Sequence, residues 1–449
     1  MSTLMFSISG VRGIIGDGLD PKTIVKFTSA YADFVKGSKI IIGKDGRVSG
    51  NMVSEIVTGT LLAKGKEVFD LGICPTPTVL YNVKKMNAAG GIAISASHNP
   101  NEWNGLKFLN DKGEFLTPGE FEVFASFVNN GGRGYNSWNA LGSKIDFTEG
   151  LKLHLDDVLK MKHIDLDIIR KRKFKILLDC VNASGAYIIP DLLKKLNCEV
   201  IELNCEKSGI FPRLAEPLPE NIVDTMRAVK ENNVDLGIVV DPDSDRLVLI
   251  TDKGKPFGEE NTITQAAKYI LSKERGNVVV NLSTTRAIDD AAAEFGCKVF
   301  RSPVGEANVV HKMKEVNAVI GGEGSGGVIY PALQYGRDAL VGIAITLQHL
   351  AETGKTISEI KEELPLYHIA KSKIEIAGLN PEAIINSLIE KYHDAEKNNE
   401  DGLRLDFKDH WVHFRKSNTE PIIRCIVEAR TEQRALELIN KYKSELIGN

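Results

Sequence analysis

The chain has 449 residues and a formal net charge of −4, with 43% hydrophobic and 26% charged residues. This composition is typical of globular proteins and excludes a disordered chain. The charge balance provides no global basic field for nucleic acid and no polybasic anchor for a membrane surface. At about 150 residues per domain, the length predicts roughly three domains, since a single core rarely exceeds ~250–300 residues.

The cysteines and the first residues indicate the compartment. The six cysteines are far apart and form no C-x-x-C pair, which favours small buried side chains over a disulfide framework. The beginning of the sequence has neither a basic segment nor a long apolar segment of a signal peptide. No run of about 18 uncharged apolar residues is present. We therefore expect a cytoplasmic protein that contacts neither membrane nor nucleic acid.

Short apolar runs alternate with segments of helical periodicity over the first 365 residues. The alternation predicts helices at 52–64, 148–161, 187–196, 221–231, 263–271 and 287–295, with another ending near 315. It predicts strands at 39–43, 67–71, 91–94, 174–178, 199–203, 236–240, 278–280, 298–300 and 318–320. This rhythm is typical of α/β units with largely parallel sheets.

After about residue 365 the rhythm changes. A strand is predicted at 374–376 and a helix at 381–392, which Pro381 can open. A polar stretch at 394–401 follows, then strands near 403–407, 411–414 and 422–429, and a final helix at 432–446. The fold class predicted is three related α/β domains with mixed, largely parallel sheets plus a smaller C-terminal α+β domain. The boundaries predicted are 1–150, 151–254, 255–366 and 367–449.

Polar loops with short side chains follow several predicted strands, where ligands bind in open α/β sheets. The first loop reads Ser95-Ala96-Ser97-His98-Asn99-Pro100. A serine on a sharp turn can carry a phosphate or act as a nucleophile, and a neighbouring histidine can exchange a proton. When this loop is considered alone, a serine-rich turn with a purely structural role is the better interpretation of its sequence. Lys107 lies on a segment expected to return beside this loop.

The second loop follows the apolar run 236–240 and reads Asp241-Pro242-Asp243-Ser244-Asp245-Arg246. Three carboxylates at alternate positions after a buried strand repel one another unless a cation neutralises them. Calcium in an EF-hand is excluded, because that loop requires glycine where this chain has Arg246. Magnesium fits better, since it keeps substrate phosphates among its ligands.

Two further loops can bind a sugar phosphate. Residues 321–327 read Gly-Gly-Glu-Gly-Ser-Gly-Gly, in which glycines allow close backbone approach and Glu323 and Ser325 can bond hydroxyl groups. Residues 415–421 read Arg-Lys-Ser-Asn-Thr-Glu-Pro. Arginine presents a planar fork to phosphate, and the alternative for this loop taken alone is a polar hairpin turn. No P-loop sequence occurs in the chain.

Together, the four loops resemble the α-D-phosphohexomutase family from end to end. The family patterns S/T-A-S-H-N-P, D-x-D-x-D-R, G-E-x-S-G and R-x-S-x-T-x-P match residues 95–100, 241–246, 322–326 and 415–421. The segments Gly10-Val11-Arg12-Gly13 and Gly43-Lys44-Asp45-Gly46-Arg47 also fit the family. The resemblance implies four domains around a central cleft, with the fourth as a mobile lid, and transfer of phosphate between the 1- and 6-hydroxyls of a hexose.

The resemblance also implies residue roles. Ser97 matches the phosphorylated serine, which with Asp241, Asp243 and Asp245 would hold one Mg²⁺ ion. Arg12, Lys107 and His98 match residues that assist proton transfer, and Arg246 a residue near the phosphoserine. Contacts to the sugar hydroxyls are implied for Glu323 and Ser325. The cradle for the second phosphate is implied for Arg415, Ser417, Asn418 and Thr419, and Arg424 is expected to add charge.

The sugar is the least determined feature. The sequence of residues 94–100, Ile-Ser-Ala-Ser-His-Asn-Pro, resembles the corresponding loop of phosphoglucosamine mutases. We therefore expect conversion of glucosamine 6-phosphate to glucosamine 1-phosphate, with a hexose 1,6-bisphosphate as activator. The alternative is a phosphoglucomutase/phosphomannomutase with relaxed specificity. A non-catalytic sugar-phosphate binder and a phosphomonoesterase are further alternatives. We expect a monomer or a homodimer whose ligand is a small sugar phosphate.

Overall fold

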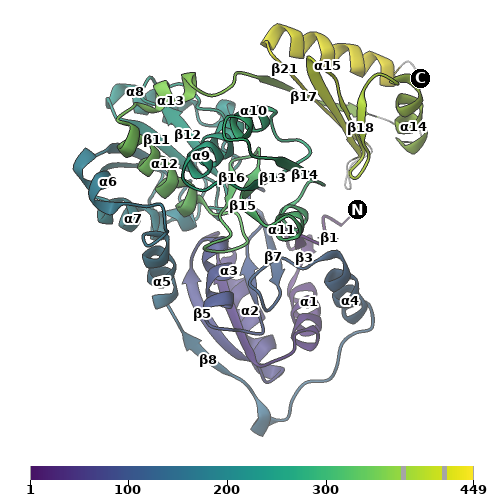
Figure 1. Ribbon diagram of the computed structural model, residues 1–449. Helices are drawn as coiled ribbons and strands as arrows, with labels where there is room; N and C mark the ends of the chain where they lie inside the picture. Colours follow the sequence, from purple (N-terminus) through teal and green to yellow (C-terminus); the bar gives the residue numbers. More distant parts are fainter. Residues whose placement is uncertain (1, 376–380, 417–421, 448–449) are drawn as a thin grey trace.

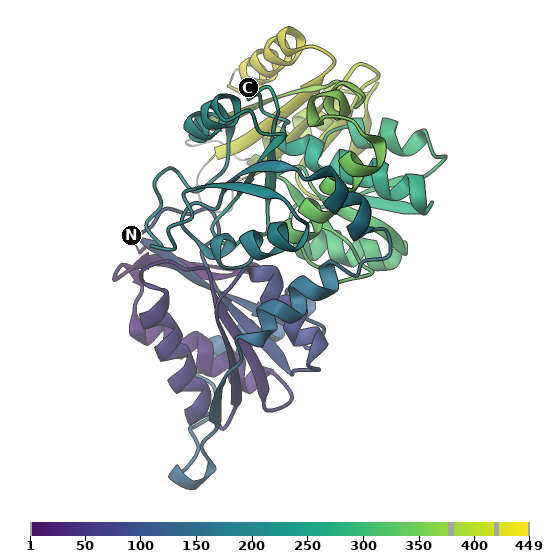
Figure 2. The ribbon, with the colours of Figure 1, turned by 90° about the vertical axis from the view of Figure 1, so that its left-hand side faces the viewer.

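The computed structural model describes residues 2–375, 381–416 and 422–447. It contains four β-sheets that follow one another along the chain (Figure 1). In the same view turned by 90°, the first sheet and its helices lie at the bottom and the three later sheets above it (Figure 2). The predicted α/β fold class with a smaller C-terminal α+β unit is confirmed. Among the described residues, no helix has the length and apolar character that crossing a membrane requires.

The first sheet has eight strands in the order β1-β2-β7-β6-β4-β5-β8, with β3 paired to β2. Its strands are β1 (Met5–Ser7), β2 (Gly10–Ile15), β3 (Gly18–Leu19), β4 (Lys39–Lys44), β5 (Glu67–Ile73), β6 (Gly90–Ile94), β7 (Trp103–Leu109) and β8 (Ser143–Asp146). The surrounding helices are α1 (Pro21–Phe34), α2 (Gly50–Ala63), α3 (Thr76–Lys85), α4 (Pro118–Asn129), the 3₁₀ turn η1 (Trp138–Ala140) and α5 (Glu149–Val158). Strand β4 pairs in parallel with β5 and β6, whereas β7 returns antiparallel to β6. This return places Lys107 beside the end of β6, as expected from the sequence.

The second sheet has four strands in the order β10-β9-β11-β12. They are β9 (Lys175–Asp179), β10 (Glu199–Leu203), β11 (Leu236–Val240) and β12 (Leu247–Thr251). Its helical segments are α6 (Leu166–Arg172), η2 (Ser184–Tyr187), α7 (Ile189–Lys195), η3 (Pro219–Asn221) and α8 (Val223–Glu231). All five residues of β11 are buried, because helices cover both faces of such a sheet.

The third sheet repeats this plan, in the order β14-β13-β15-β16. Its strands are β13 (Asn277–Asn281), β14 (Val299–Ser302), β15 (Ala318–Glu323) and β16 (Gly327–Ile329). Its helices are α9 (Glu259–Lys273), α10 (Ala287–Ala293), α11 (Glu306–Glu315), α12 (Ala339–Thr353) and α13 (Ile357–Glu362). In both sheets a parallel β-α-β core ends in one antiparallel strand, so the similar rhythm of the two sequence segments has a structural counterpart.

The fourth sheet is antiparallel, in the order β17-β21-β20-β19-β18. Its strands are β17 (His368–Glu375), β18 (Glu396–Asn398), β19 (Leu403–Asp406), β20 (His410–Lys416) and β21 (Ile422–Ala429), with helices α14 (Pro381–Lys391) and α15 (Glu432–Ile447). Strand β18 lies in the stretch 394–401, for which the sequence predicts only a polar segment. Its residues are exposed or half-buried, so it carries no apolar pattern.

The hydrophobic core is not divided in the same way as the sheets. One cluster of buried side chains runs from Leu155 to Leu364 and includes residues of the second and third sheets. The first and fourth sheets have clusters of their own, and the second and third sheets each have a smaller separate cluster besides the shared one. The predicted boundary after residue 254 therefore separates two sheets that share one apolar core.

Two predicted loops begin differently in the structure. Strand β15 continues through Glu323, because Gly321, Gly322 and Glu323 pair with β16. The prediction of a loop starting at Gly321 is therefore wrong, and the turn covers residues 324–326 only. Likewise Arg415 and Lys416 belong to β20 and pair with β21, so the predicted loop at 415–421 begins too early.

Candidate active site

The ends of strands from the first three sheets bring the polar segments together. Ser95–Pro100 follow β6, Asp241–Arg246 follow β11, and Glu323 ends β15. The amide of Ala339 donates to the carbonyl of Ser244 and the amide of Thr76 to the carbonyl of Asp243, so helices from the units of the first and third sheets both contact the acidic loop of the second. The carboxyl ends of the parallel strands form the site, as the general rule for α/β sheets predicts.

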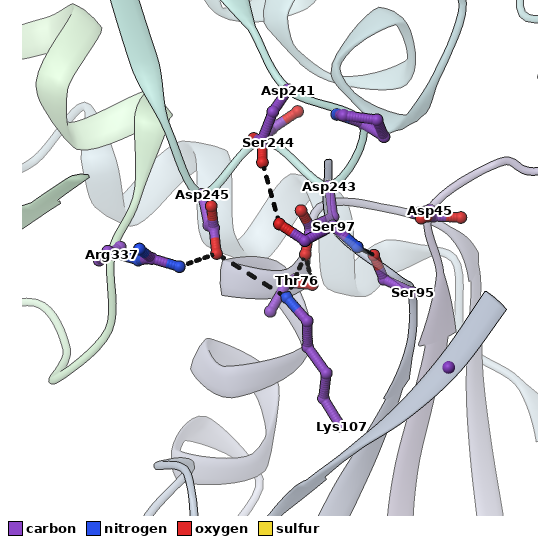
Figure 3. Close-up of polar contacts among 12 residues, drawn as sticks. Asp45, Thr76, Ser95, Ser97, Lys107, Asp241, Asp243, Ser244, Asp245 and Arg337 are labelled. Atoms are coloured by element: carbon purple, nitrogen blue, oxygen red, sulfur yellow. Dashed lines mark hydrogen bonds and ion pairs between the residues drawn. The ribbon is translucent and has the colours of Figure 1, made fainter. Parts of the chain in front are cut away.

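Ser97 lies at the centre of this region. Its backbone has φ of +51°, a left-handed conformation that non-glycine residues adopt only when their surroundings impose it. Its amide donates to Ser95 Oγ at 2.8 Å. Its Oγ lies 3.4 Å from Asp241 Oδ2 and 3.5 Å from His98 Nδ1. The hydroxyl of a strained turn is thereby directed at the acidic loop of the second sheet (Figure 3).

The three aspartates have ligand oxygens within 4.8 Å of one another, and all three are buried. Thr76 Oγ1 and Lys107 Nζ both donate to Asp243 Oδ2, at 2.5 and 2.6 Å. Arg337 Nη2 donates to Asp245 Oδ2 at 2.5 Å. Within the described residues, the other oxygens of these two side chains, Asp243 Oδ1 and Asp245 Oδ1, are buried without a hydrogen-bond partner.

These orphaned oxygens fit a hard cation. Burial together with Asp245 and Asp243 raises the pKa of Asp241 well above its ordinary value. Burial opposes ionisation of Asp243 too, but Lys107 and Thr76 outweigh it and lower the pKa of that carboxyl. A cation would satisfy both orphaned oxygens and allow Asp241 to ionise. The residues present can therefore hold a divalent metal ion.

The cationic residues predicted for proton transfer surround Ser97. Arg246 Nη2 lies 3.2 Å from His98 Nδ1, and Arg12 Nη1 donates to Asn99 Oδ1 at 3.1 Å. Burial, with Arg246 and Arg12 nearby, lowers the pKa of His98 to about 3, so its imidazole is neutral. Burial lowers the pKa of Lys107, but Asp243 and Asp245 outweigh it and raise that pKa. Lys107 is therefore a fixed positive charge.

Glu323 is tied to the acidic loop through one arginine. Arg337 Nη1 donates to Glu323 Oε2 at 2.6 Å, while Nε donates to Glu306 Oε2 at 3.0 Å. Glu323 Oε1 accepts from Asn281 Nδ2 at 2.8 Å and from the amide of Gly305 at 3.1 Å. Ser325 lies in the following turn and is partly buried. Arg337 thus contacts both the acidic loop and the predicted sugar loop.

Arg415 is connected to the same region by two consecutive amides. Asp401 Oδ2 pairs with Arg415 Nε at 2.8 Å and accepts from the amide of Val304 at 2.9 Å. The next amide, that of Gly305, is the donor to Glu323. Arg424 lies directly opposite Arg415 on β21 and is exposed. The predicted phosphate ligands Ser417, Asn418 and Thr419 lie outside the described residues.

Four residues of the site were not expected from the sequence as functional groups. They are Thr76, Glu216, Arg337 and Arg47. Thr76 begins a helix 167 positions before its partner Asp243, and Glu216 Oε1 accepts from Arg246 Nη1 at 3.0 Å. No local pattern marks these side chains, because their importance comes from contacts between sheets. Among these four residues, only Arg47 could have been found from the sequence, because it belongs to the segment 43–47 that fits the family pattern.

The similarity to known proteins extends over all the segments that form the site. The chain matches four domains described as phosphoglucomutase/phosphomannomutase: α/β/α domain I at residues 3–130, domain II at 152–254, domain III at 259–367 and the C-terminal domain at 381–442. It is 35% identical to a Methanopyrus kandleri protein named probable phosphoglucosamine mutase, over 97% of this chain and 96% of the relative. A phosphoglucomutase/phosphomannomutase of Thermococcus kodakarensis is 34% identical, with the same coverage of each chain.

A third relative, from Sulfurisphaera tokodaii, is named phosphoglucosamine/phosphogalactosamine mutase and is 32% identical over 99% of both chains. Solved structures share the fold. A phosphoglucomutase/phosphomannomutase family protein from Burkholderia thailandensis superposes with a TM-score of 0.85 at 24% identity, covering 98% of each chain. An Aspergillus fumigatus N-acetylphosphoglucosamine mutase, solved with GlcNAc-6P and magnesium, gives 0.59 at 14% identity, over 98% of this chain and 95% of that one. This chain therefore belongs to the phosphoglucomutase/phosphomannomutase family of phosphohexomutases, isomerases that transfer phosphate within their substrate.

Proposed function

We propose that this enzyme interconverts glucosamine 6-phosphate and glucosamine 1-phosphate, through a phosphoserine at Ser97 and a bisphosphorylated sugar. The observation that carries the proposal is the position of Ser97 Oγ, 3.4 Å from Asp241 and beside two carboxylates with orphaned oxygens. A phosphate on this hydroxyl would lie between the acidic loop and the cations Arg12, Lys107 and Arg246. Such a placement suits phosphoryl transfer, which depends on positioning and charge stabilisation.

In this proposal Asp241, Asp243 and Asp245, together with the serine phosphate, bind one Mg²⁺ ion. When bound, Mg²⁺ withdraws charge from the transferring phosphoryl group. Lys107 and Thr76 fix one oxygen of Asp243, and Arg337 fixes one oxygen of Asp245, so that the opposite oxygens are free for the ion.

The reaction consists of two transfers. The phosphoryl group on Ser97 moves to the free sugar hydroxyl, and the hydroxyl proton passes to a neighbouring base. Arg12, Lys107 and His98 are the residues proposed to assist this transfer, and His98 Nδ1 lies 3.5 Å from Ser97 Oγ and accepts from Arg246 Nη2 at 3.2 Å. After the sugar turns over, the other phosphoryl group returns to Ser97 and the sugar oxygen that it leaves regains a proton. A hexose 1,6-bisphosphate charges an enzyme that has lost its phosphate.

The sugar and its second phosphate would bind at the third and fourth sheets. Glu323 and Ser325 are proposed to bond the sugar hydroxyls. Three cationic residues, Arg415, Arg424 and Lys373, lie side by side across β20, β21 and β17. A guanidinium presents a planar fork of donors that suits phosphate, so Arg415 and Arg424 can bind an anion here. We assign Arg415 and Arg424, with Ser417, Asn418 and Thr419, to the phosphate that is not transferred.

Glucosamine phosphate is proposed because two of the three relatives described above carry phosphoglucosamine mutase names. The relative named phosphoglucomutase/phosphomannomutase favours a second candidate, relaxed specificity for glucose and mannose phosphates. Coupled assays with glucosamine 6-phosphate, glucose 1-phosphate and mannose 1-phosphate decide between them. A higher kcat/KM on glucose 1-phosphate would reject the amino sugar.

The proposed phosphoserine mechanism is tested by mass spectrometry. Intact-mass and peptide analysis of the purified enzyme should find a fraction with one phosphate at Ser97, increased by incubation with hexose 1,6-bisphosphate. The Ser97→Ala variant should carry no phosphate and show no mutase activity. A fully active Ser97→Ala variant contradicts the proposed mechanism. Release of inorganic phosphate faster than isomerisation would instead indicate a phosphomonoesterase.

A further inference from the structure

The side chain of Arg47 is buried beneath the loop that carries Ser97. Its relative exposure is 2%, and its guanidinium donates to four backbone carbonyls of the loop. Nη2 bonds the carbonyls of Ser97 and Asn99 at 2.6 and 2.7 Å. Nη1 bonds those of Pro100 and Trp103. With Nε bonded to Asp45 Oδ2 at 2.9 Å, all five N–H groups of the side chain are used.

These bonds act on the strained residue itself. Ser97 has a left-handed backbone, which costs free energy and persists only when neighbouring groups impose it. Its amide is held by Ser95 Oγ and its carbonyl by Arg47. Because both ends of the residue are fixed, the direction of its Cα–Cβ bond is fixed as well, and with it the set of positions that Oγ can reach beside Asp241.

The second sheet covers the other side of Arg47. The ring of Phe211 lies over the guanidinium at 4.9 Å, and the amide of Phe211 donates to Asn101 Oδ1 at 3.2 Å. The same connection between β10 and α8 carries Glu216, the partner of Arg246. The connection after β10 therefore covers Arg47 where the units of the first two sheets meet.

We propose that Arg47 is the positioning residue for Ser97, holding the hydroxyl in the orientation needed for phosphoryl transfer without touching the substrate. This inference rests on the proposed function, in which Ser97 carries the phosphate. Lysine cannot replace arginine here, because an ammonium group has three donors and no planar fork. The charge would remain after an Arg47→Lys change, but at least two of the five contacts would be lost.

The test compares Arg47→Lys with the wild-type enzyme. We expect kcat to fall at least 30-fold while KM for the sugar phosphate changes less than threefold, because the arginine contacts the loop and not the sugar. Charging of Ser97 by hexose 1,6-bisphosphate, followed by intact mass, should slow by a similar factor. A kcat within threefold of wild type would overturn the inference.

Hydrogen–deuterium exchange provides a readout that does not depend on mutase activity. Amides of residues 96–103 should exchange at least tenfold faster in Arg47→Lys, with the strands of the other sheets unchanged. The matched control is Arg404→Lys, which alters an equally buried arginine of the fourth sheet and should leave this loop unaffected. Unchanged loop exchange in Arg47→Lys overturns the inference, even if kcat falls.

Phe211→Leu is the second variant, in case Arg47→Lys does not fold. It removes the ring over the guanidinium without placing a new polar group, and should raise loop exchange and lower kcat by two- to fivefold. Loop exchange equal to that of the wild type would contradict the inference. Absence of both phosphate on Ser97 and mutase activity in the wild-type enzyme would refute the proposed function instead, and the exchange experiment separates the two cases.

Discussion

Ser97 Oγ lies 3.4 Å from Asp241 Oδ2, although the two residues are 144 positions apart in the chain and belong to different sheets. The serine lies in the loop after β6 and the aspartate directly after β11, so the candidate nucleophile and the candidate metal loop meet only when the units of the first two sheets pack together. The relationship makes the acidic loop the place where metal binding, charge and phosphoryl transfer can be tested jointly.

Asp241→Asn should show that the acidic loop lowers folding stability in the absence of metal but is required for Mg²⁺ binding and mutase activity. Without metal, the variant should unfold at a higher temperature than the wild type, because a buried carboxyl crowded by two others is removed. Added Mg²⁺ should stabilise the wild type but not the variant. Mutase activity should fall by about 10²-fold or more, as for loss of one preorganised charge interaction.

Thermal unfolding in EDTA and in Mg²⁺ measures both effects. The control is Asp235→Asn, which changes an acid of the same sheet that accepts from the amide of Lys175 at its far end. Equal stabilisation of Asp241→Asn and the wild type by Mg²⁺ would disprove the metal assignment.

Arg337→Met should weaken stability and sugar binding together. The side chain links Asp245, Glu323 and Glu306, and removing one partner of a buried ion pair typically costs about 3–5 kcal/mol. Glu323 should lose its fixed orientation, so KM for the sugar phosphate should rise about tenfold, which corresponds to 1.4 kcal/mol. Steady-state kinetics and thermal unfolding give the two values.

A matched control is Lys64→Met, which breaks a buried pair with Asp33 at 2.8 Å in the first sheet's unit. It should lower stability and leave KM unchanged. If Arg337→Met and Lys64→Met have the same KM, then Arg337 has no role in sugar binding.

Glu260 should make stability depend on pH. Its Oε2 accepts from the amide of Thr285 at 2.9 Å, and Glu259, Lys371 and Glu428 surround it. Burial, partly offset by Lys371, raises the pKa of Glu260 from 4.5 to about 8. Because the folded state holds this proton more tightly, the resulting stabilisation is complete below pH 4.5 and is lost as the pH rises through 8.

Glu260→Gln is neutral at every pH and should therefore match the wild type in unfolding temperature near pH 5 and exceed it at pH 9. Glu259→Gln is the control, since Glu259 pairs with Lys371 at 2.7 Å and its loss should not stabilise the protein at high pH. An unfolding temperature difference between Glu260→Gln and the wild type that is the same at pH 5 and pH 9 would contradict the raised pKa.

Arg424→Gln should weaken sugar-phosphate binding without destabilising the fold. Arg424 is exposed, and surface substitutions of this kind usually change stability by less than about 0.5 kcal/mol. Hydrogen bonds to charged groups contribute about 1.5–3 kcal/mol, and KM should rise at least about tenfold. The comparison is Arg434→Gln, an exposed arginine on α15 paired with Asp409. Unchanged KM in Arg424→Gln would remove this residue from the phosphate site.

The sequence predicted the strand ends of the site well, because its signals are local. Leu236–Val240 is a continuous apolar run and is a fully buried strand, and the three aspartates follow it directly. Other elements had no such signal. Strand β8 is exposed at all four residues, and no helix was predicted at Ala339–Thr353, whose buried side chains surround the helix without a polar face.

Several residues of the site depend on contacts that no local pattern describes. Glu323 belongs to a strand because β16 pairs with it, and Thr76 and Arg337 reach the acidic loop from 167 and 92 positions away. The order of residues along the chain thus determined which groups could bind phosphate and metal. Only the packing of the sheets decided which oxygens of Asp243 and Asp245 are occupied by Thr76, Lys107 and Arg337 and which are left for a cation, because that division requires side chains from separate sheets to meet.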